Sequence, residues 1–137
     1  MQQKGMVWVI GASGGLGRAT AQAFAQNGWS VIAGARSFAA GTSPLGEGVT
    51  VLPLDVTSEE SCTAFVKKAL GMENRVDVLV CAAAQLVLGS CENTTVDELD
   101  KLLNVNVLGT VRMIQRALPL MRAQKSGKII LFSSING

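Results

Sequence analysis

Short runs of apolar residues alternate with helical patterns along most of the chain. The run Met6–Ile10 contains only apolar residues and is followed by a glycine, which is typical of a strand buried on both faces of a parallel sheet. Apolar and small side chains then recur at helical spacing, at Leu16, Ala19, Thr20, Ala23 and Phe24. Asn27 and Gly28 end this pattern, so the N-terminal region is predicted to form a strand, a glycine-rich turn and a helix.

The same alternation continues toward the C-terminus. Further strands are predicted at residues 30–33, 49–54, 76–82 and 129–132. Between the first two of these, the stretch 37–48 is rich in Gly, Ser and Pro, which predicts a surface loop. Strands that alternate with helices imply right-handed crossovers, so the sequence predicts an α/β fold with a doubly wound parallel sheet of five strands.

Three further helices have recognisable signals in the sequence. Thr57 with Glu60 and Thr95 with Glu98 fit capping boxes, in which a hydroxyl and a carboxylate satisfy backbone amides at a helix start. These residues are therefore interpreted as structural. A long helix is predicted over residues 104–123, with one apolar face formed by Val107, Val111, Ile114, Leu118 and Met121.

The composition fits one domain and disfavours several classes of protein. At 137 residues and 48% hydrophobic composition, the chain is long enough for one core and too short for two domains of ordinary size. It has 12 basic and 10 acidic residues, a formal charge of +2 and no basic run, so a nucleic-acid partner is not expected. No apolar segment approaches the length that spans a bilayer, so no membrane association is expected.

The cysteine and histidine content bears on metals and on the compartment. The three cysteines, Cys62, Cys81 and Cys91, are an odd number without C-x-x-C spacing, and the chain has no histidine. Because histidine is the commonest metal ligand and acid–base group, no metal site is expected. This cysteine pattern fits a reducing compartment, and we expect the cytoplasm.

The turn between the first strand and its helix holds the strongest candidate binding residues, Gly11, Ser13, Gly15, Leu16 and Gly17. Glycines let the backbone approach a pyrophosphate closely, while the helix N-terminus directs amide donors and a partial positive charge toward it. The G-x-x-x-G-x-G spacing differs from the common G-x-G-x-x-G fingerprint and lacks the Lys-Ser/Thr of a nucleoside triphosphatase loop. It therefore predicts a nicotinamide cofactor site; the alternative is a tight turn without a ligand.

The choice of cofactor is predicted by the residue at the end of the second strand. An acidic side chain there would accept a hydrogen bond from the adenosine 2′-hydroxyl, whereas a basic one would hold a 2′-phosphate. This chain has Arg36 and no carboxylate nearby. Because a guanidinium fits phosphate, the sequence predicts NADP in preference to NAD, and the alternative is an exposed loop arginine.

At these residues the chain resembles the short-chain dehydrogenase/reductase family, and the likeness extends over all 137 residues. The matching segments are the glycine turn, the pair Asp55-Val56, the strand 76–80, the Asn-x-x-Gly motif within 104–110, and the strand 129–134 with its two serines. The resemblance implies a Rossmann-like fold with three layers, α/β/α. It also implies an NADP-dependent oxidoreductase that interconverts alcohols and carbonyl compounds by hydride transfer.

Roles for individual residues are also implied by the resemblance. Asn106 is similar to the asparagine that shapes the long helix and anchors a water molecule in a proton relay. Ser134 is similar to the serine that orients the substrate carbonyl, so both are candidate catalytic residues. Asp55 and Val56 match the pair that packs beside the adenine. The alternatives are a polar residue inside a helix for Asn106 and a strand-end cap for Ser134.

The segment from Cys81 to Ala84 departs from the Asn-Asn-Ala-Gly of the family. Its sequence is Cys-Ala-Ala-Ala, so the side-chain amides and the glycine that support the cofactor in the family are absent here. The backbone at Ala83 is retained as a candidate contact with the cofactor. Cys81, at the end of a predicted buried strand, is interpreted as a small core residue and not as a reactive thiol.

The second departure concerns the proton donor. In this family a tyrosine in a Tyr-x-x-x-Lys motif after the serine strand supplies the proton, and the lysine lowers the pKa of that tyrosine. This chain has no tyrosine. We therefore interpret it as the N-terminal part of such an oxidoreductase, without the last strands and helices, and expect the isolated chain to be inactive. Without a histidine, Ser134 does not fit a serine hydrolase.

Two alternatives stay open: a non-catalytic nucleotide-binding module, and one half of a split enzyme whose tyrosine and lysine come from another chain. For the full-length parent we expect a carbonyl or alcohol substrate and a homo-oligomer. In the family's arrangement the helix 104–123 packs against a later helix and a partner subunit. Its apolar residues are therefore expected to be uncovered in this chain.

Overall fold

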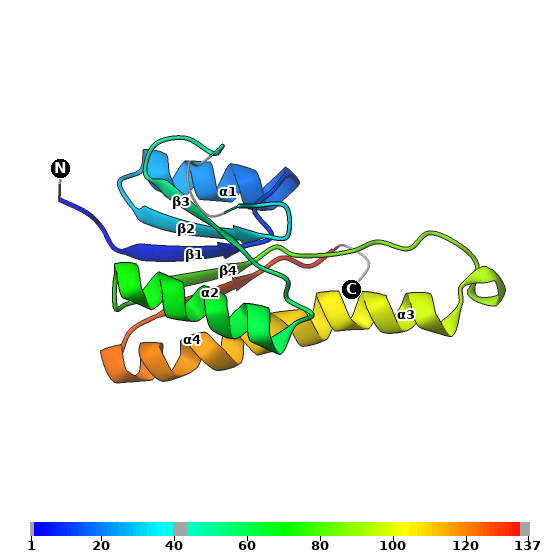
Figure 1. Cartoon of the computed structure of the whole chain (residues 1–137). Coiled ribbons are helices and arrows are strands. Elements are labelled where there is room, and N and C mark those ends of the chain that lie inside the picture. The colour runs from blue at the N-terminus through cyan, green and yellow to red at the C-terminus, as the bar shows by residue number, and fades with distance from the viewer. Residues whose placement is uncertain (1, 40–43, 135–137) are drawn as a thin grey trace.

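The computed structural model describes residues 2–39 and 44–134. These form one parallel sheet whose strands, in chain order, are β1 (Met6–Ile10), β2 (Ser30–Ala35), β3 (Val49–Pro53), β4 (Val78–Cys81) and β5 (Lys128–Leu131). Across the sheet the order is β3-β2-β1-β4-β5, and every neighbouring pair is parallel. The chain therefore moves from β1 outward to β3, returns to β4 and ends at β5 (Figure 1), which confirms the doubly wound α/β fold.

Helices cover both faces of this sheet. Helix α1 (Gly15–Gln26) lies on one face, and α2 (Glu59–Met72) and α4 (Thr110–Gln124) lie on the other (Figure 1). The direction in which the chain moves across the sheet explains why α1 lies on one face and α2 and α4 on the other. Right-handed connections place their helices on opposite faces when that direction reverses. The three-layer arrangement is therefore confirmed.

Alternate residues of β1 point into different halves of the core. Trp8 and Ile10 lie in a cluster with Phe65 of α2 and Met113 of α4, whereas Val9 lies in the cluster on the α1 side. Trp8 and Phe65 meet edge to face, with ring centroids 5.9 Å apart. Burial on both faces is the physical reason for the uninterrupted apolar run in this strand.

The observed strand limits differ slightly from the predicted ones. β1 lies where it was predicted, but β2 continues to Ala35 because it pairs with β3 up to Pro53. β3 and β4 are shorter than predicted, and β5 lies one residue earlier, in register with β4. In the predicted loop 37–48, residues 40–43 lie outside the described part of the chain, and the described remainder contains no helix or strand.

The predicted capping box at Thr57 is wrong, whereas the one at Thr95 is confirmed. Helix α2 is capped by Ser58, whose hydroxyl accepts from Ser61 N at 3.1 Å. Thr57 instead donates its backbone N–H and its hydroxyl to Asp55 Oδ1. The side chain of Thr57 is therefore engaged by this carboxylate and does not cap the helix. At the start of α3 (Val96–Leu103), Thr95 and Glu98 form both hydrogen bonds of a capping box.

The predicted long helix is part of a longer helical column. Helix α3, the π-helical turn η2 (Asn104–Gly109) and α4 follow one another with helical backbone at both junctions (Figure 1). The predicted apolar face was partly wrong: Met121 is buried as part of the core side, but the other buried residues are Gly109, Met113 and Ala117, whereas Val107 and Val111 are exposed. The wider turn η2 shifts the phase of the helix, so a regular period of 3.6 residues carried from η2 into α4 assigns the wrong face.

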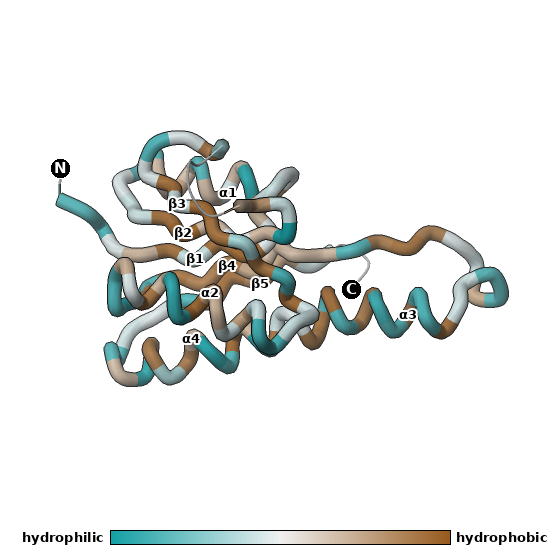
Figure 2. Tube along the Cα trace, in the orientation of Figure 1, coloured by the Kyte–Doolittle hydropathy of each residue, from teal (hydrophilic) through white to brown (hydrophobic). Residues whose placement is uncertain are grey.

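Much of the outer side of this column is apolar and uncovered; of the face expected to be uncovered, Val107 and Val111 are exposed, whereas Met121 is buried. Helix α3 has no buried residue and, with the segment before it, extends beyond the sheet (Figure 1). Hydrophobic and hydrophilic positions alternate along α3 (Figure 2). We call the exposed side chains on the column the apolar stripe; they are Val96, Leu99, Leu103, Val107, Leu108 and Val111.

Candidate cofactor-binding site

The glycine turn lies at the carboxyl end of β1, between the ends of its two neighbouring strands. Gly11 N and Ala12 N both donate to the carbonyl oxygen of Gly34 in β2, at 2.8 and 3.2 Å. On the other side, a Cβ on Gly11 would lie 2.4 Å from the backbone nitrogen of Ala83, and Gly11 has a φ of +84°. Only glycine fits this position, which lies where the strand order reverses and where such sheets bind ligands.

Two further glycines set the start of α1. A Cβ on Gly17 would lie 2.0 Å from the carbonyl oxygen of Gly11, so the first turn of the helix packs directly on the end of β1. Gly15 has a φ of +56°, and the N-cap residue Gly14 contributes no side-chain hydrogen bond. No acidic residue occupies the first turn of α1. The amides at this helix start are therefore directed toward the edge of the sheet without a competing carboxylate, as an anion site requires.

A cavity of about 260 Å³ opens above this turn. Its walls come from the turn, from the ends of β2, β3 and β4, and from η2. The lining residues are Ile10, Gly11, Ser13, Gly14, Ala35, Arg36, Leu54, Asp55, Val56, Ala82, Ala83, Ala84, Gln85 and Val105. The structure therefore brings together residues from five separate parts of the sequence.

Six of the nine predicted cofactor-binding residues line this cavity: Gly11, Ser13, Arg36, Asp55, Val56 and Ala83. Three others do not. Gly17 lies under the turn and supports Gly11, Leu16 is 64% exposed, and Gly15 shapes the backbone at the helix start. The prediction missed Gln85 and Val105; Val105 adjoins Asn106 in the Asn-x-x-Gly motif, which is a signal that could have indicated it.

Arg36 follows β2 and reaches the cavity from the side of the turn. Together with Ser13 and Ser37 it also lines a second hollow beside the cavity. Among the described residues it has no hydrogen-bond or ion-pair partner, so its guanidinium donors are available to a ligand.

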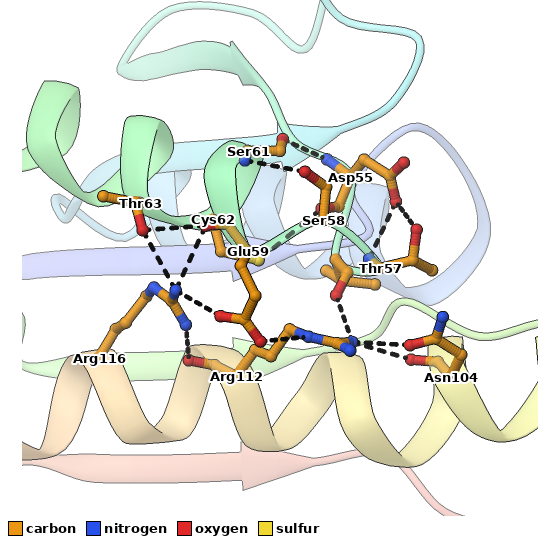
Figure 3. Close-up of polar contacts among 11 residues, drawn as sticks. Asp55, Thr57, Ser58, Glu59, Ser61, Cys62, Thr63, Asn104, Arg112 and Arg116 are labelled. Atoms are coloured by element: carbon orange, nitrogen blue, oxygen red, sulfur yellow. Dashed lines mark hydrogen bonds and ion pairs between the residues drawn. The ribbon is translucent and has the colours of Figure 1, made fainter.

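Asp55 is fixed by its neighbours at the end of β3. Its Oδ1 accepts hydrogen bonds from the hydroxyl of Thr57 at 2.7 Å and from Thr57 N at 2.9 Å (Figure 3). These two hydrogen bonds lower the pKa of Asp55 despite its partial burial, and the charge of Arg36 lowers it further. Asp55 N also donates to the hydroxyl of Ser61 at 2.9 Å. The carboxylate is therefore ionised at neutral pH and held in one place.

Asn106 holds the opposite wall of the cavity. Its Oδ1 accepts from Gln85 N at 2.7 Å, and its Nδ2 donates to the carbonyl oxygen of Gln85 at 2.8 Å. The side chain thus replaces the strand neighbour that Gln85 lacks beyond the end of β4. This residue lies in η2, so the helical column and the segment after β4 are joined here.

Ser134 lies beyond β5 and is exposed, and neither it nor Asn106 is among the described residues that line the cavity. Phe132 N donates to the carbonyl oxygen of Cys81 at 3.3 Å, so the chain before Ser134 runs beside the end of β4. Cys81 is only 5% exposed, and burial raises the pKa of its thiol to about 12. The interpretation of Cys81 as a core residue is confirmed.

The described residues contain no group of three His, Cys, Asp or Glu side chains placed to hold a metal ion. The cavity residues do fit a dinucleotide. Gly11 and Gly17 let the turn and the helix start pack closely against the ends of the strands, and amides of an uncapped helix face the same edge.

The family described as short chain dehydrogenase matches this chain over residues 5–137. The chain belongs to the short-chain dehydrogenase family. It is 34% identical over 135 residues to a 3-ketodihydrosphingosine reductase of Bacteroides thetaiotaomicron, across 98% of this chain and 49% of that protein. It is 41% identical over 87 residues to an estradiol 17-beta-dehydrogenase 1 of Rattus norvegicus, across 64% of this chain and 25% of that protein.

A solved structure supports the same family. A short-chain dehydrogenase from Streptomyces avermitilis superimposes with a TM-score of 0.85 at 34% identity, over 94% of this chain and 49% of that one. The chain thus spans about half the length, or less, of these relatives. In the described residues, none of the helices is long and apolar enough to cross a membrane.

Proposed function

We propose that this chain forms the NADP-binding part of a short-chain oxidoreductase that interconverts an alcohol and a carbonyl compound. The observation that carries the preference for NADP is Arg36, which lines a hollow with Ser13 and Ser37 beside the main cavity. A guanidinium and two hydroxyls provide donors for a 2′-phosphate, and among the described residues no carboxylate lines this hollow to accept from a 2′-hydroxyl.

Each part of the cavity has a proposed role in holding the cofactor. The amides of the turn from Gly11 to Gly17 bind the pyrophosphate, Asp55 and Val56 lie beside the adenine, and the backbone at Ala83 contacts the nicotinamide half. When bound, NADP supplies or accepts the hydride. The walls exclude water and fix the orientation of the ligand.

The proposed roles near the substrate belong to Ser134 and Asn106. The hydroxyl of Ser134 orients the oxygen of the carbonyl or alcohol, and Asn106 keeps η2 and the segment at Gln85 in place. A positioned proton donor contributes ~10²–10⁴-fold to such a reaction, and this chain has neither tyrosine nor histidine. We therefore expect the 137-residue chain alone to bind the cofactor without reducing ketones or aldehydes.

The absence of both residue types also favours two variants of this proposal. One is a module that binds NADP without catalysis, and the other is a chain completed by a second polypeptide that carries tyrosine and lysine. A ketone is added to the chain with NADPH, and the absorbance of NADPH is followed at 340 nm. This measurement distinguishes the two inactive variants from an active enzyme. Steady oxidation of NADPH by the pure chain would overturn the expectation of inactivity.

The apolar stripe supports the proposal that the full-length protein is a homo-oligomer. Val107 is 50% exposed and Val111 is 41% exposed on the same helical column. An uncovered apolar surface of this kind favours association with a complementary surface. A cytoplasmic location is proposed from the cysteines, because all three are free and Cys91 is exposed.

The cofactor proposal is tested by titrating the chain with NADP⁺ and NAD⁺ in a calorimeter. We expect tighter binding of NADP⁺, and loss of this preference in Arg36→Ala. Arg18→Ala is the matched control, because Arg18 lies on α1 and, within residues 2–39 and 44–134, its side chain donates only to the carbonyl oxygen of Pro44, at 3.3 Å. Equal affinity for both cofactors in the unchanged chain, or an unchanged preference in Arg36→Ala, would contradict the proposal.

A further inference from the structure

Two walls of the cofactor cavity come from strands that do not pair with each other. Asp55 and Val56 follow β3, whereas the segment from Ala82 to Gln85 follows β4. In the sheet, β2 and β1 lie between β3 and β4, so no ladder of backbone hydrogen bonds connects the two walls directly. The sheet therefore links the two walls only through β2 and β1, and beyond the strand ends other contacts can fix their spacing.

Arg112 of α4 connects the first wall to the helical column. Its Nη1 donates to the carbonyl oxygen of Val56 at 3.0 Å and to Asn104 Oδ1 at 2.8 Å, and its Nε donates to Glu59 Oε1 at 2.8 Å (Figure 3). The Arg112 side chain is only 16% exposed. One planar guanidinium therefore ties the end of β3, the start of α2 and the start of η2 together.

The same π-helical turn holds the second wall. Asn104 begins η2 and accepts from Arg112, and two residues later Asn106 binds both backbone groups of Gln85. Val105, between these two asparagines, lines the cavity itself. The contacts thus run without interruption from Val56 through Arg112 and η2 to Gln85.

A close approach of backbones makes this connection stiff. A Cβ on Gly109, the last residue of η2, would lie 2.6 Å from Val56 Cγ2, so the column rests directly on the wall that Arg112 binds. Interiors packed in this way transmit displacements instead of absorbing them.

We propose that Arg112 is a positioning residue that fixes the spacing of the two walls of the cofactor cavity, through Val56 on one side and the turn η2 on the other. The proposal deepens the proposed function and rests on it, because the effect on ligand affinity presupposes that the cavity binds NADP. Arg112 touches none of the residues assigned to the reaction. It acts by holding Val56 and η2 in the positions that the cofactor requires.

Arg116, one turn further along α4, provides a matched control. Its Nη2 donates to the other oxygen of the same carboxylate, Glu59 Oε2, at 2.7 Å, and to the hydroxyl of Thr63 at 3.2 Å (Figure 3). Its side chain is 20% exposed, close to the 16% of Arg112. None of its recorded hydrogen bonds goes to Val56 or η2, so the two arginines share charge, helix and ion-pair partner and differ in the contact under test.

The experiment compares Arg112→Gln and Arg116→Gln in the 137-residue chain. We expect the dissociation constant for NADP⁺ to rise about tenfold in Arg112→Gln and to change by less than about threefold in Arg116→Gln. Both variants lose an ion pair to Glu59, so their melting temperatures are expected to fall by similar amounts. A purely structural role would therefore move both variants together in both measurements, whereas the proposal separates them in affinity alone.

Hydrogen exchange supplies a readout that does not depend on the cofactor. In the absence of NADP⁺, the amides of residues 82–85 and 105–109 are expected to exchange faster in Arg112→Gln than in Arg116→Gln. If the unchanged chain fails to bind NADP⁺, the proposed function is overturned. Faster exchange in Arg112→Gln alone would then still support the role of Arg112 in holding the two walls of the cavity. Equal exchange in the two variants overturns the proposal whether or not NADP⁺ binds.

Arg112→Lys keeps the experiment decisive if Arg112→Gln does not fold. Lysine retains the charge beside Glu59, but its single ammonium cannot donate in two directions from one plane as the guanidinium does. We expect an affinity for NADP⁺ between those of the unchanged chain and Arg112→Gln. An affinity equal to that of the unchanged chain, together with unchanged exchange at residues 82–85, would overturn the proposal.

Discussion

Gly17 and Gly11 are in contact across the start of α1, where a Cβ on Gly17 would lie 2.0 Å from the carbonyl oxygen of Gly11. We predict that Gly17→Ala lowers the free energy of unfolding by about 1–3 kcal/mol, because the helix must move away from the end of β1. It should also abolish measurable binding of NADP⁺. Urea denaturation and calorimetric titration check the two effects.

Gly71→Ala is the control for this substitution. A Cβ on Gly71, near the exposed C-terminal end of α2, would meet nothing within 4 Å. Alanine is expected to stabilise this helix by roughly 0.5–1 kcal/mol and to leave cofactor binding unchanged. If Gly17→Ala behaved like Gly71→Ala in both measurements, the close packing of the turn would be refuted.

Asn106→Ala tests the wall at Gln85. The substitution leaves the backbone N–H and carbonyl of Gln85 without their partner, so we expect a loss of about 1–3 kcal/mol in the free energy of unfolding and weaker NADP⁺ binding. Asn93→Ala is the control, because exposed Asn93 donates to the hydroxyl of Ser90 far from the cavity. Equal losses in the two variants would show that Asn106 has no special role.

The stability of the protein is predicted to depend on pH through the carboxylate of Asp55. Hydrogen bonds from the hydroxyl and then the backbone N–H of Thr57 hold the pKa of Asp55 below its ordinary value of 3.8. Because the folded state favours the ionised carboxylate, its contribution to stability is present above pH 3.8 and is lost as the pH falls through the lowered value. Thr57→Val is expected to raise the pKa of Asp55 in a ¹³C NMR titration. A pKa unchanged by this substitution would contradict the assignment of the cause.

The cysteines are expected to differ in reactivity. Cys91 is exposed, whereas Cys62 and Cys81 are buried, and burial raises the pKa of both buried thiols. At pH 8 a thiol reagent such as Ellman's reagent should therefore modify Cys91 rapidly in the native chain and the other two only after denaturation. Cys91→Ser should remove the rapid phase. Rapid reaction of a second thiol in the native chain would disagree with the burial of Cys62 and Cys81.

Local signals in the sequence were sufficient for several elements. The limits of β1 could be predicted because an apolar run of the right length is followed directly by Gly11. The cap of α3 could be predicted because Thr95 and Glu98 satisfy each other without help from distant residues. The glycine turn was recognisable because its spacing and its place after a strand are properties of one short segment.

Other features depend on residues far apart in the chain. The turn η2 is held by contacts of Gly109 and Arg112 with Val56, and no local period indicates them. The apolar face assigned to 104–123 was partly wrong for that reason. Similarly, the cap of α2 lies at Ser58 and not at Thr57, because Asp55 competes for the hydroxyl of Thr57. Cavity residues such as Gln85 are identified only when the walls are assembled.

The central claim is that the cavity above the glycine turn binds NADP. The most direct measurement is a titration of the ¹⁵N-labelled chain with NADP⁺, followed by amide chemical shifts. We predict the largest changes at residues 11–17, Arg36, Asp55, Val56 and residues 82–85, because these form or support the cavity. No saturable change, or changes confined to the hollow formed by Leu118, Met121 and Ile129, would contradict the claim.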